Sequence, residues 1–73
     1  MRKTDQSKNN YFSILMANFN NANYIESAIN SVLKQTYTNW ELIIVDDCSV
    51  DDSIKIIKPF LSDKRIKLIQ LKV

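Results

Sequence analysis

Residues 42–52 read LIIVDDCSVDD, and this stretch indicates both a fold class and the place of a binding site. Four apolar residues run directly into a pair of carboxylates, and a hydroxyl and a second carboxylate pair follow. An apolar run of this kind is typical of a buried parallel strand. In open α/β sheets, ligands bind in the crevice outside the carboxyl ends of the strands. The stretch therefore predicts an α/β fold with a polar site just after this strand.

Two more strands and two helical patterns alternate around this central strand, which spans 40–45. We expect a first strand over 12–17 and a third over 66–73. Between the first two strands, apolar residues recur at steps of three and four, which predicts an amphipathic helix. The predicted apolar stripe consists of Tyr24, Ile25, Ala28, Ile29, Val32 and Leu33. A second helical face follows the central strand and consists of Ile54, Ile57 and Leu61.

The ends of both helices carry signals for their start and stop. Asn20 or Asn21 is expected to cap the first helix, because asparagine side chains bond local backbone amides. Asp51 and Asp52 precede the second helix, where capping and the macrodipole favour carboxylates; this role explains them better than ligand contact does. Pro59 lacks a backbone amide, so the second helix should break or kink there.

The order β-α-β-α-β predicts a three-stranded parallel sheet with right-handed crossovers. We expect one domain over 11–73, preceded by a flexible polar tail over 1–10. Crossovers of one hand in a unit wound in one direction place both helices on the same face of the sheet. Because the strands carry apolar side chains on both faces, we expect one apolar face and one strand edge to be left uncovered.

Composition excludes several classes of function. The chain has 73 residues and a net charge of +2, which is too weak to favour nucleic acid or an anionic membrane as a partner. It contains no histidine, so histidine bases and metal sites are excluded, and no glycine, so glycine-dependent phosphate loops are excluded. Its single cysteine allows no internal disulfide. No apolar run approaches the ~20 residues of a transmembrane helix.

Two loops, 18–23 and 46–52, follow the carboxyl ends of the first two strands. If these strands are neighbours, Phe19 and Asp47 face one pocket. An ionised carboxylate only accepts hydrogen bonds, so it suits a ligand with N–H or O–H groups. An aromatic ring offers a stacking surface for a flat base. A uracil ring fits both features, but the acidic loop has no arginine, so a diphosphate here would need a metal ion to offset the repulsion.

Structural roles compete with ligand binding at each of these positions. Asp47 sits just past the strand end and is the residue we favour as a ligand contact. Asp46 can equally contact a ligand or orient the loop through backbone amides. Phe19, taken alone, is more typical of a core residue. Cys48 has no basic neighbour to activate it and is interpreted as a loop residue.

At this point the sequence resembles the start of the family 2 glycosyltransferases with the GT-A fold. Three segments carry the resemblance in the expected order and spacing: SILMANFN over 13–20, SVLKQTY over 31–37 and ELIIVDDCSVD over 41–51. The run IKPFLSD over 57–63 is also similar to the spore-coat polysaccharide-synthesis member of the family. The resemblance implies that the chain is the N-terminal, nucleotide-binding βαβαβ part of a Rossmann-like GT-A fold.

The resemblance also implies roles for individual residues. Phe19 stands at the aromatic position that stacks near the base, and Asp47, in a pair with Asp46, at the acid that accepts from it. Ala17 lines the same pocket, in place of a frequent proline or threonine. Cys48 stands where glycine or asparagine is frequent.

The implied reaction is sugar transfer from a nucleotide-diphosphate sugar, with uridine as the expected nucleoside, to a hydroxyl acceptor. It would serve glycan or cell-surface polysaccharide synthesis and use a divalent metal, manganese or magnesium. The family's metal motif and catalytic base have no counterpart in this sequence. We therefore expect a fragment that is inactive alone, located in the cytoplasm or peripherally at the inner face of the membrane.

A non-catalytic function is the alternative. A short α/β module with an uncovered apolar sheet face is expected to self-associate or to bind a partner through that face. The two hypotheses differ in what they require of the isolated chain: a nucleotide site in one case and a protein contact in the other.

Overall fold

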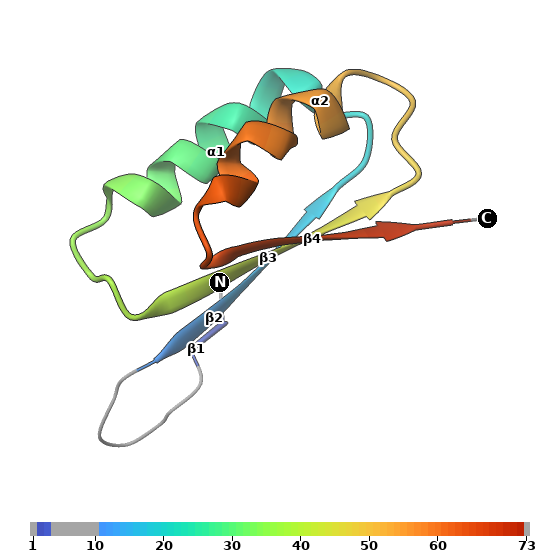
Figure 1. The fold of residues 1–73 in the computed structure, drawn as a ribbon. Helices are drawn as coiled ribbons and strands as arrows, with labels where there is room; N and C mark the ends of the chain where they lie inside the picture. The colour runs from blue at the N-terminus through green and yellow to red at the C-terminus, as the bar shows by residue number, and fades with distance from the viewer. Residues whose placement is uncertain (1, 4–10, 73) are drawn as a thin grey trace.

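A four-stranded sheet organises the fold (Figure 1). The computed structural model describes residues 2–3 and 11–72. Strands pair in the order β1-β2-β3-β4, with β2, β3 and β4 parallel and β1 antiparallel to β2. Their bounds are Arg2–Lys3 for β1, Phe12–Asn18 for β2, Trp40–Asp47 for β3 and Ile66–Leu71 for β4. The predicted α/β class with a parallel βαβαβ unit is confirmed.

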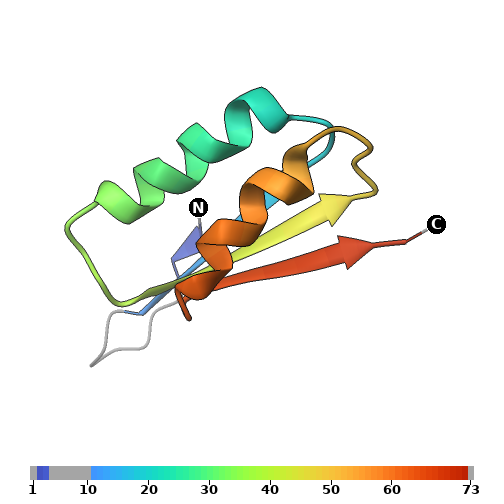
Figure 2. The same ribbon diagram turned by 45° about the horizontal axis from the view of Figure 1, so that its top comes forward.

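The helices lie together on one face of the sheet (Figures 1 and 2). Helix α1 spans Ala22–Lys34, helix α2 spans Ser53–Ile57, and a 3-10 helix, η1, continues over Lys58–Ser62. The predicted break is confirmed, because the α-helix ends at Ile57 and Pro59 lies at the start of η1. Proline is tolerated at this position, since the first amides of a helical segment have no partner within it.

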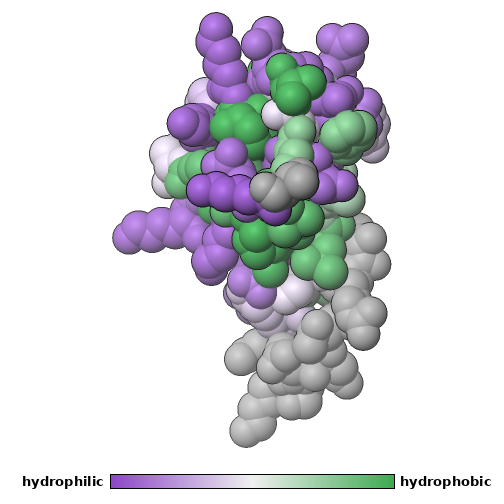
Figure 3. Space-filling model, turned by 90° about the vertical axis from the view of Figure 1, so that its right-hand side faces the viewer, coloured by the Kyte–Doolittle hydropathy of each residue, from purple (hydrophilic) through white to green (hydrophobic). Residues whose placement is uncertain are grey.

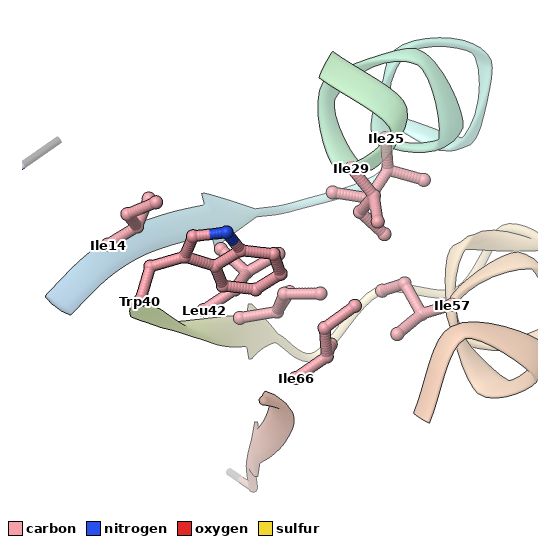
Figure 4. Close-up of a cluster of buried hydrophobic side chains, with 8 residues drawn as sticks. Ile14, Ile25, Ile29, Trp40, Leu42, Ile57 and Ile66 are labelled. Atoms are coloured by element: carbon pink, nitrogen blue, oxygen red, sulfur yellow. The ribbon is translucent and has the colours of Figure 1, made fainter. Parts of the chain in front are cut away.

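The core lies between the helices and the face of the sheet that they cover. Strand β3 alternates strictly, so that every second side chain, beginning with Trp40, is buried and the intervening ones are partly exposed. These side chains meet isoleucines from the helices (Figure 4). Full burial of such a side chain contributes about 1.5–3 kcal/mol. The buried cluster consists of Ile14, Ile25, Ile29, Trp40, Leu42, Ile44, Ile57 and Ile66.

Several features differ from the sequence expectations. Strand β3 was predicted over 40–45 but extends to Asp47, so Asp47 is the last residue of the strand and does not lie beyond it. Strand β1 was not predicted; it lies within the segment expected as a polar tail, of which residues 1 and 4–10 are outside the described residues. The third parallel strand ends at Leu71, before the predicted 73, and Val73 is also outside the described residues. Tyr24 is 60% exposed, so its assignment to the buried stripe was wrong. It lies in the first turn of α1, ahead of the buried residues of that helix.

Within residues 2–3 and 11–72, no helix covers the other face of the sheet, and we call it the open face. Its side chains are the odd-numbered residues of β2, β3 and β4, since side chains alternate along a strand. At the amino end of the strands the open face is polar: the Ser13 hydroxyl donates to the Glu41 carboxylate at 2.8 Å, and the Lys67 ammonium lies 3.7 Å from the same carboxylate.

Beyond this polar row the open face is apolar. Leu15 is 57% exposed there, although it has the same size and chemistry as core residues. The predicted uncovered apolar face is therefore confirmed. The apolar residues of the open face are Leu15, Ala17, Ile43, Val45, Ile69 and Leu71, and Asp47 follows at the carboxyl end. None of the helices within residues 2–3 and 11–72 has the length and hydropathy needed to cross a membrane.

A pair of leucine-to-alanine substitutions tests this division of the sheet. Leu42 is fully buried on the covered face, so Leu42→Ala removes packed methyl groups and should lower the free energy of unfolding by about 2–5 kcal/mol. Leu15 is largely exposed on the open face, so Leu15→Ala should change it by less than about 1 kcal/mol. Urea denaturation of both variants measures the difference, and equal losses would contradict the assignment of the two faces.

Candidate functional site

Two loops meet at the carboxyl end of the sheet. One leads from β2 to α1 over 19–21, and the other leads from β3 to α2 over 48–52. The strands that precede them are neighbours, and Asn18, the last residue of β2, is the register partner of Asp46, the next-to-last residue of β3. Figure 3 looks at this end of the molecule, where hydrophobic and hydrophilic surfaces lie side by side. The adjacency of the two strands, on which the predicted pocket depends, is therefore present.

Asp46 is the buried centre of this end of the sheet, with 2% of its surface exposed. Its Oδ1 accepts from Asn18 Nδ2 at 2.8 Å and from the Ser49 hydroxyl at 2.6 Å. Its Oδ2 accepts from the Ser49 backbone amide at 2.9 Å. Burial alone would raise the pKa of Asp46, but the hydrogen bonds from Ser49 and Asn18 outweigh it and lower this pKa below 3.8. The ionised carboxylate thus orients its loop through a backbone amide, one of the two roles predicted for it.

Asn20 joins the two loops from the other side. Its Oδ1 accepts from the Val50 amide at 2.7 Å and from the Asp51 amide at 3.4 Å. Its own backbone amide donates to the Ser49 hydroxyl at 2.8 Å. Asn20 has a φ of 48°, in the left-handed region that asparagine tolerates better than most residues. We call the set Asn18, Asn20, Asp46, Ser49 and Asp51 the interloop latch.

Asp51 completes the latch by capping both helices. Its carboxylate accepts from the Ala22 amide at 3.0 Å, at the start of α1, and from the Ser53 amide at 2.9 Å, at the start of α2. The Ser53 hydroxyl donates to it as well, and these bonds lower the pKa of Asp51. Capping by Asp51 was predicted, but its reach to α1 was not.

The other predicted caps were wrong. Asn21 and Asp52 occupy the N-cap positions of α1 and α2, yet neither makes a side-chain cap hydrogen bond. Asn20 accepts from the opposite loop instead, and Asp51 bonds the first amide of α1 in place of the local asparagines. A carboxylate in the neighbouring loop thus satisfies an amide that sequence reasoning assigned to nearby asparagines.

The predicted ligand contacts stand free beside the latch. Phe19 follows Asn18 and is 60% exposed, so it is not a core residue. Asp47 follows Asp46 and is exposed, and its carboxylate accepts no hydrogen bond from the part of the chain that the structure describes. Ala17 is exposed on the open face, in register with Val45. An acceptor and an aromatic ring thus emerge from neighbouring strand ends, an arrangement that suits a flat ring with an N–H group.

Sequence reasoning missed Asn18, Asn20 and Ser49 as supports of the site. The bonds that join the two loops have partners 28–31 residues apart in the chain, so no local pattern marks them. The available signal was the pairing of an asparagine-rich loop with an acidic, serine-containing loop at the ends of two adjacent strands. One acceptor of this cluster, Asn18 Oδ1, is buried without a hydrogen-bond partner among the described residues.

Cys48 is the residue of the second loop whose backbone has a positive φ. Its φ is 60°, in the left-handed region, and its thiol donates to the Leu71 carbonyl at 3.1 Å. The thiol thereby ties the loop to β4. It remains a loop residue.

The divalent metal implied by the resemblance has no fitting ligand set in the described part of the chain. No three Asp, Glu or Cys side chains gather there to hold a metal ion. Asp46 and Asp51 are already used by protein donors.

Comparisons with known proteins agree with the arrangement. The model of the family described as "Glycosyl transferase family 2" matches residues 13–73. The Escherichia coli UDP-Glc:alpha-D-GlcNAc-diphosphoundecaprenol beta-1,3-glucosyltransferase WfgD is 48% identical over 58 residues, which are 78% of this chain and 22% of WfgD. TarS of Staphylococcus aureus, named a poly(ribitol-phosphate) beta-N-acetylglucosaminyltransferase, is 34% identical over 62 residues, 82% of this chain and 11% of TarS.

A solved structure shows the same fold. The crystal structure of residues 1–349 of Staphylococcus aureus TarS matches with a TM-score of 0.79 and 31% sequence identity. The match covers 86% of this chain and 19% of the TarS chain. The chain thus corresponds to the N-terminal part of the TarS GT-A domain, and it spans about a fifth of the length of WfgD and less of TarS.

The adjacent carboxylates provide a test of the latch. Asp46→Asn replaces a buried charge that accepts three hydrogen bonds, so at pH 7 it should lower the free energy of unfolding by about 1.5–3 kcal/mol. Asp47→Asn is the matched control and should change it by less than about 0.5 kcal/mol. Urea denaturation measures both.

The pH dependence of stability provides a second test of the ionised state of Asp46. The pKa of Asp46 is lowered in the folded chain, so its contribution is complete above about pH 4, the unfolded value, and is lost as the pH falls through the folded value. The difference in free energy of unfolding between the wild-type chain and Asp46→Asn should therefore become smaller below about pH 4. A difference that is constant with pH would contradict the ionised, hydrogen-bonded state of Asp46.

Proposed function

Because this chain belongs to glycosyltransferase family 2, we propose that it forms the nucleotide-binding start of an enzyme that transfers a sugar from a nucleotide-diphosphate donor to a hydroxyl acceptor. WfgD, whose name specifies UDP-glucose, supports uridine as the nucleoside. Relatives named for diphosphoundecaprenol-linked and poly(ribitol-phosphate) substrates support a role in cell-surface polysaccharide synthesis. The similarity of residues 57–63 to a spore-coat member, and a location in the cytoplasm or at the inner face of the membrane, remain predictions.

The observation that carries this proposal is the pair of unused groups at neighbouring strand ends. Asp47 is a free acceptor for a ring N–H, and Phe19 is a free stacking surface. Ala17 lines the same corner on the open face. Asp46, buried and hydrogen-bonded to Ser49 and Asn18, supports the pair from beneath.

The strength of these contacts defines what the chain can do alone. A hydrogen bond to a charged group contributes about 1.5–3 kcal/mol, and a base–aromatic stack about 1–3 kcal/mol. Association costs an estimated 4–15 kcal/mol. These two contacts alone therefore cannot hold a nucleotide tightly, and we assign the transfer step to no described residue.

Titration with uridine diphosphate, followed by the amide NMR signals of the chain, tests the proposed site. We expect saturable shifts of the Asp47 and Phe19 signals at millimolar ligand. Asp47→Ala removes the charged acceptor and should raise the dissociation constant at least tenfold. 3-Methyluridine diphosphate is the matched control ligand, because it lacks the ring N–H. It should bind to the wild-type chain as weakly as uridine diphosphate binds to Asp47→Ala. Shifts that occur elsewhere while Asp47 and Phe19 remain unmoved would contradict the assignment.

A second candidate function rests on the open face. Leu15 and its apolar neighbours on that face are exposed, and β4 has a free edge. Such a surface favours association of the chain with itself or with a partner. This non-catalytic function needs no nucleotide and is tested independently.

Sedimentation velocity separates the two candidates. If the open face mediates self-association, the wild-type chain should sediment increasingly as a dimer or larger species at higher concentration. Leu15→Glu should then restore the monomer, because it places a charge within the contact. Ser27→Glu, on the exposed side of α1, is the control and should have no effect. A wild-type chain that stays monomeric at all concentrations would exclude self-association.

A further inference from the structure

We propose that Asn20 is a positioning residue of the nucleotide site. Through its side-chain amide, it holds the backbone at Phe19 in a fixed position relative to the loop over 48–52, which follows Asp47. The inference rests on the proposed function and goes beyond it, because Asn20 contacts the opposite loop and needs no contact with the nucleotide. Its observation is the set of bonds from Asn20 to residues about 30 positions away.

Phe19 is not among the described side chains that pack against the hydrophobic core. Its ring is 60% exposed, so its direction depends on the backbone on either side. On one side, Asn18 is held by Asp46 at 2.8 Å. On the other side, Asn20 is held by the Ser49 hydroxyl and the Val50 amide, at 2.8 and 2.7 Å. Release of the second anchor would leave the ring attached at one end only.

Asp47 is held in a comparable way by the same network. Asp46 precedes it and is buried in the latch, while Cys48 follows it and bonds to β4. Asn20 bonds to the loop over 48–52, which directly follows Asp47. The orientations of the Phe19 ring and of the Asp47 carboxylate are therefore coupled. A ligand that meets both groups in place avoids the cost of ordering two mobile loops.

The role belongs to the side chain of Asn20 for two separable reasons. Its backbone lies at a φ of 48°, and its Oδ1 is the acceptor for two amides of the opposite loop. Glycine keeps access to positive φ but deletes the acceptor. Aspartate keeps the acceptor and tolerates the left-handed region. Asn20 is exposed and so contributes little apolar burial of its own.

Three variants test this role by nucleotide binding and urea denaturation. Asn20→Gly should raise the dissociation constant for uridine diphosphate about tenfold, with displaced Phe19 and Asp47 amide signals in the free chain. Asn20→Asp should bind within about twofold of the wild-type chain, since the acceptor is retained. Ser27→Gly lowers stability within α1, away from the loops, and should leave the dissociation constant unchanged.

The outcomes are distinguishable. A dissociation constant of Asn20→Gly that equals the wild-type value would overturn the positioning role but not the proposed function. A dissociation constant of Asn20→Asp as high as that of Asn20→Gly would do the same. An equal loss of nucleotide affinity in Ser27→Gly would show that lowered stability accounts for the effect, and would also overturn the positioning role. If the wild-type chain fails to bind uridine diphosphate, the proposed function and this inference both fail.

Discussion

The buried carboxylate of Asp46 is the interaction on which the carboxyl end of the sheet depends. A charge removed from water is costly unless it is fully paired. Here the pairing comes from two separate pieces of chain, Asn18 at the end of β2 and Ser49 in the loop after β3. The cost of burial is therefore offset only when the two strand ends lie in register. One ionised group thus links the alignment of the strands to the geometry of the loops above them.

Neighbouring carboxylates acquire opposite roles through the two-residue period of the strand. Trp40, Leu42 and Ile44 point toward the helices, and Asp46 continues their row to the covered face. Asp47 is one residue further and emerges on the exposed side. This alternation was readable in the sequence. The residue type of Asp46 allows two roles, whereas its position along the strand favours the structural one.

Most of the fold was predictable because its signals are local. The apolar run of β3, the three- and four-residue steps of α1 and the break at Pro59 each lie within a short window. The bonds of the latch that join the two loops were not predictable, because strand register brings their partners together from 28–31 residues apart. Among the latch residues, only the bonds between Ser49 and Asp46 are local. Strand β1 has two polar residues, too few to show a period. Phe19 and Asp47 were predicted as site residues from their places near strand ends, and this role stays a prediction. The residues that hold their loops were not predicted.

The open face ends at the candidate site, and this proximity has a thermodynamic consequence. Asp47 and Leu71 are register partners, so the last apolar residue of that face stands beside the free carboxylate. Any body that packs over Leu71 also changes the solvation of Asp47, and with it the free energy of a hydrogen bond to that carboxylate. Linkage then requires reciprocity: a partner that strengthens nucleotide binding is itself bound more tightly when the nucleotide is present, by the same factor.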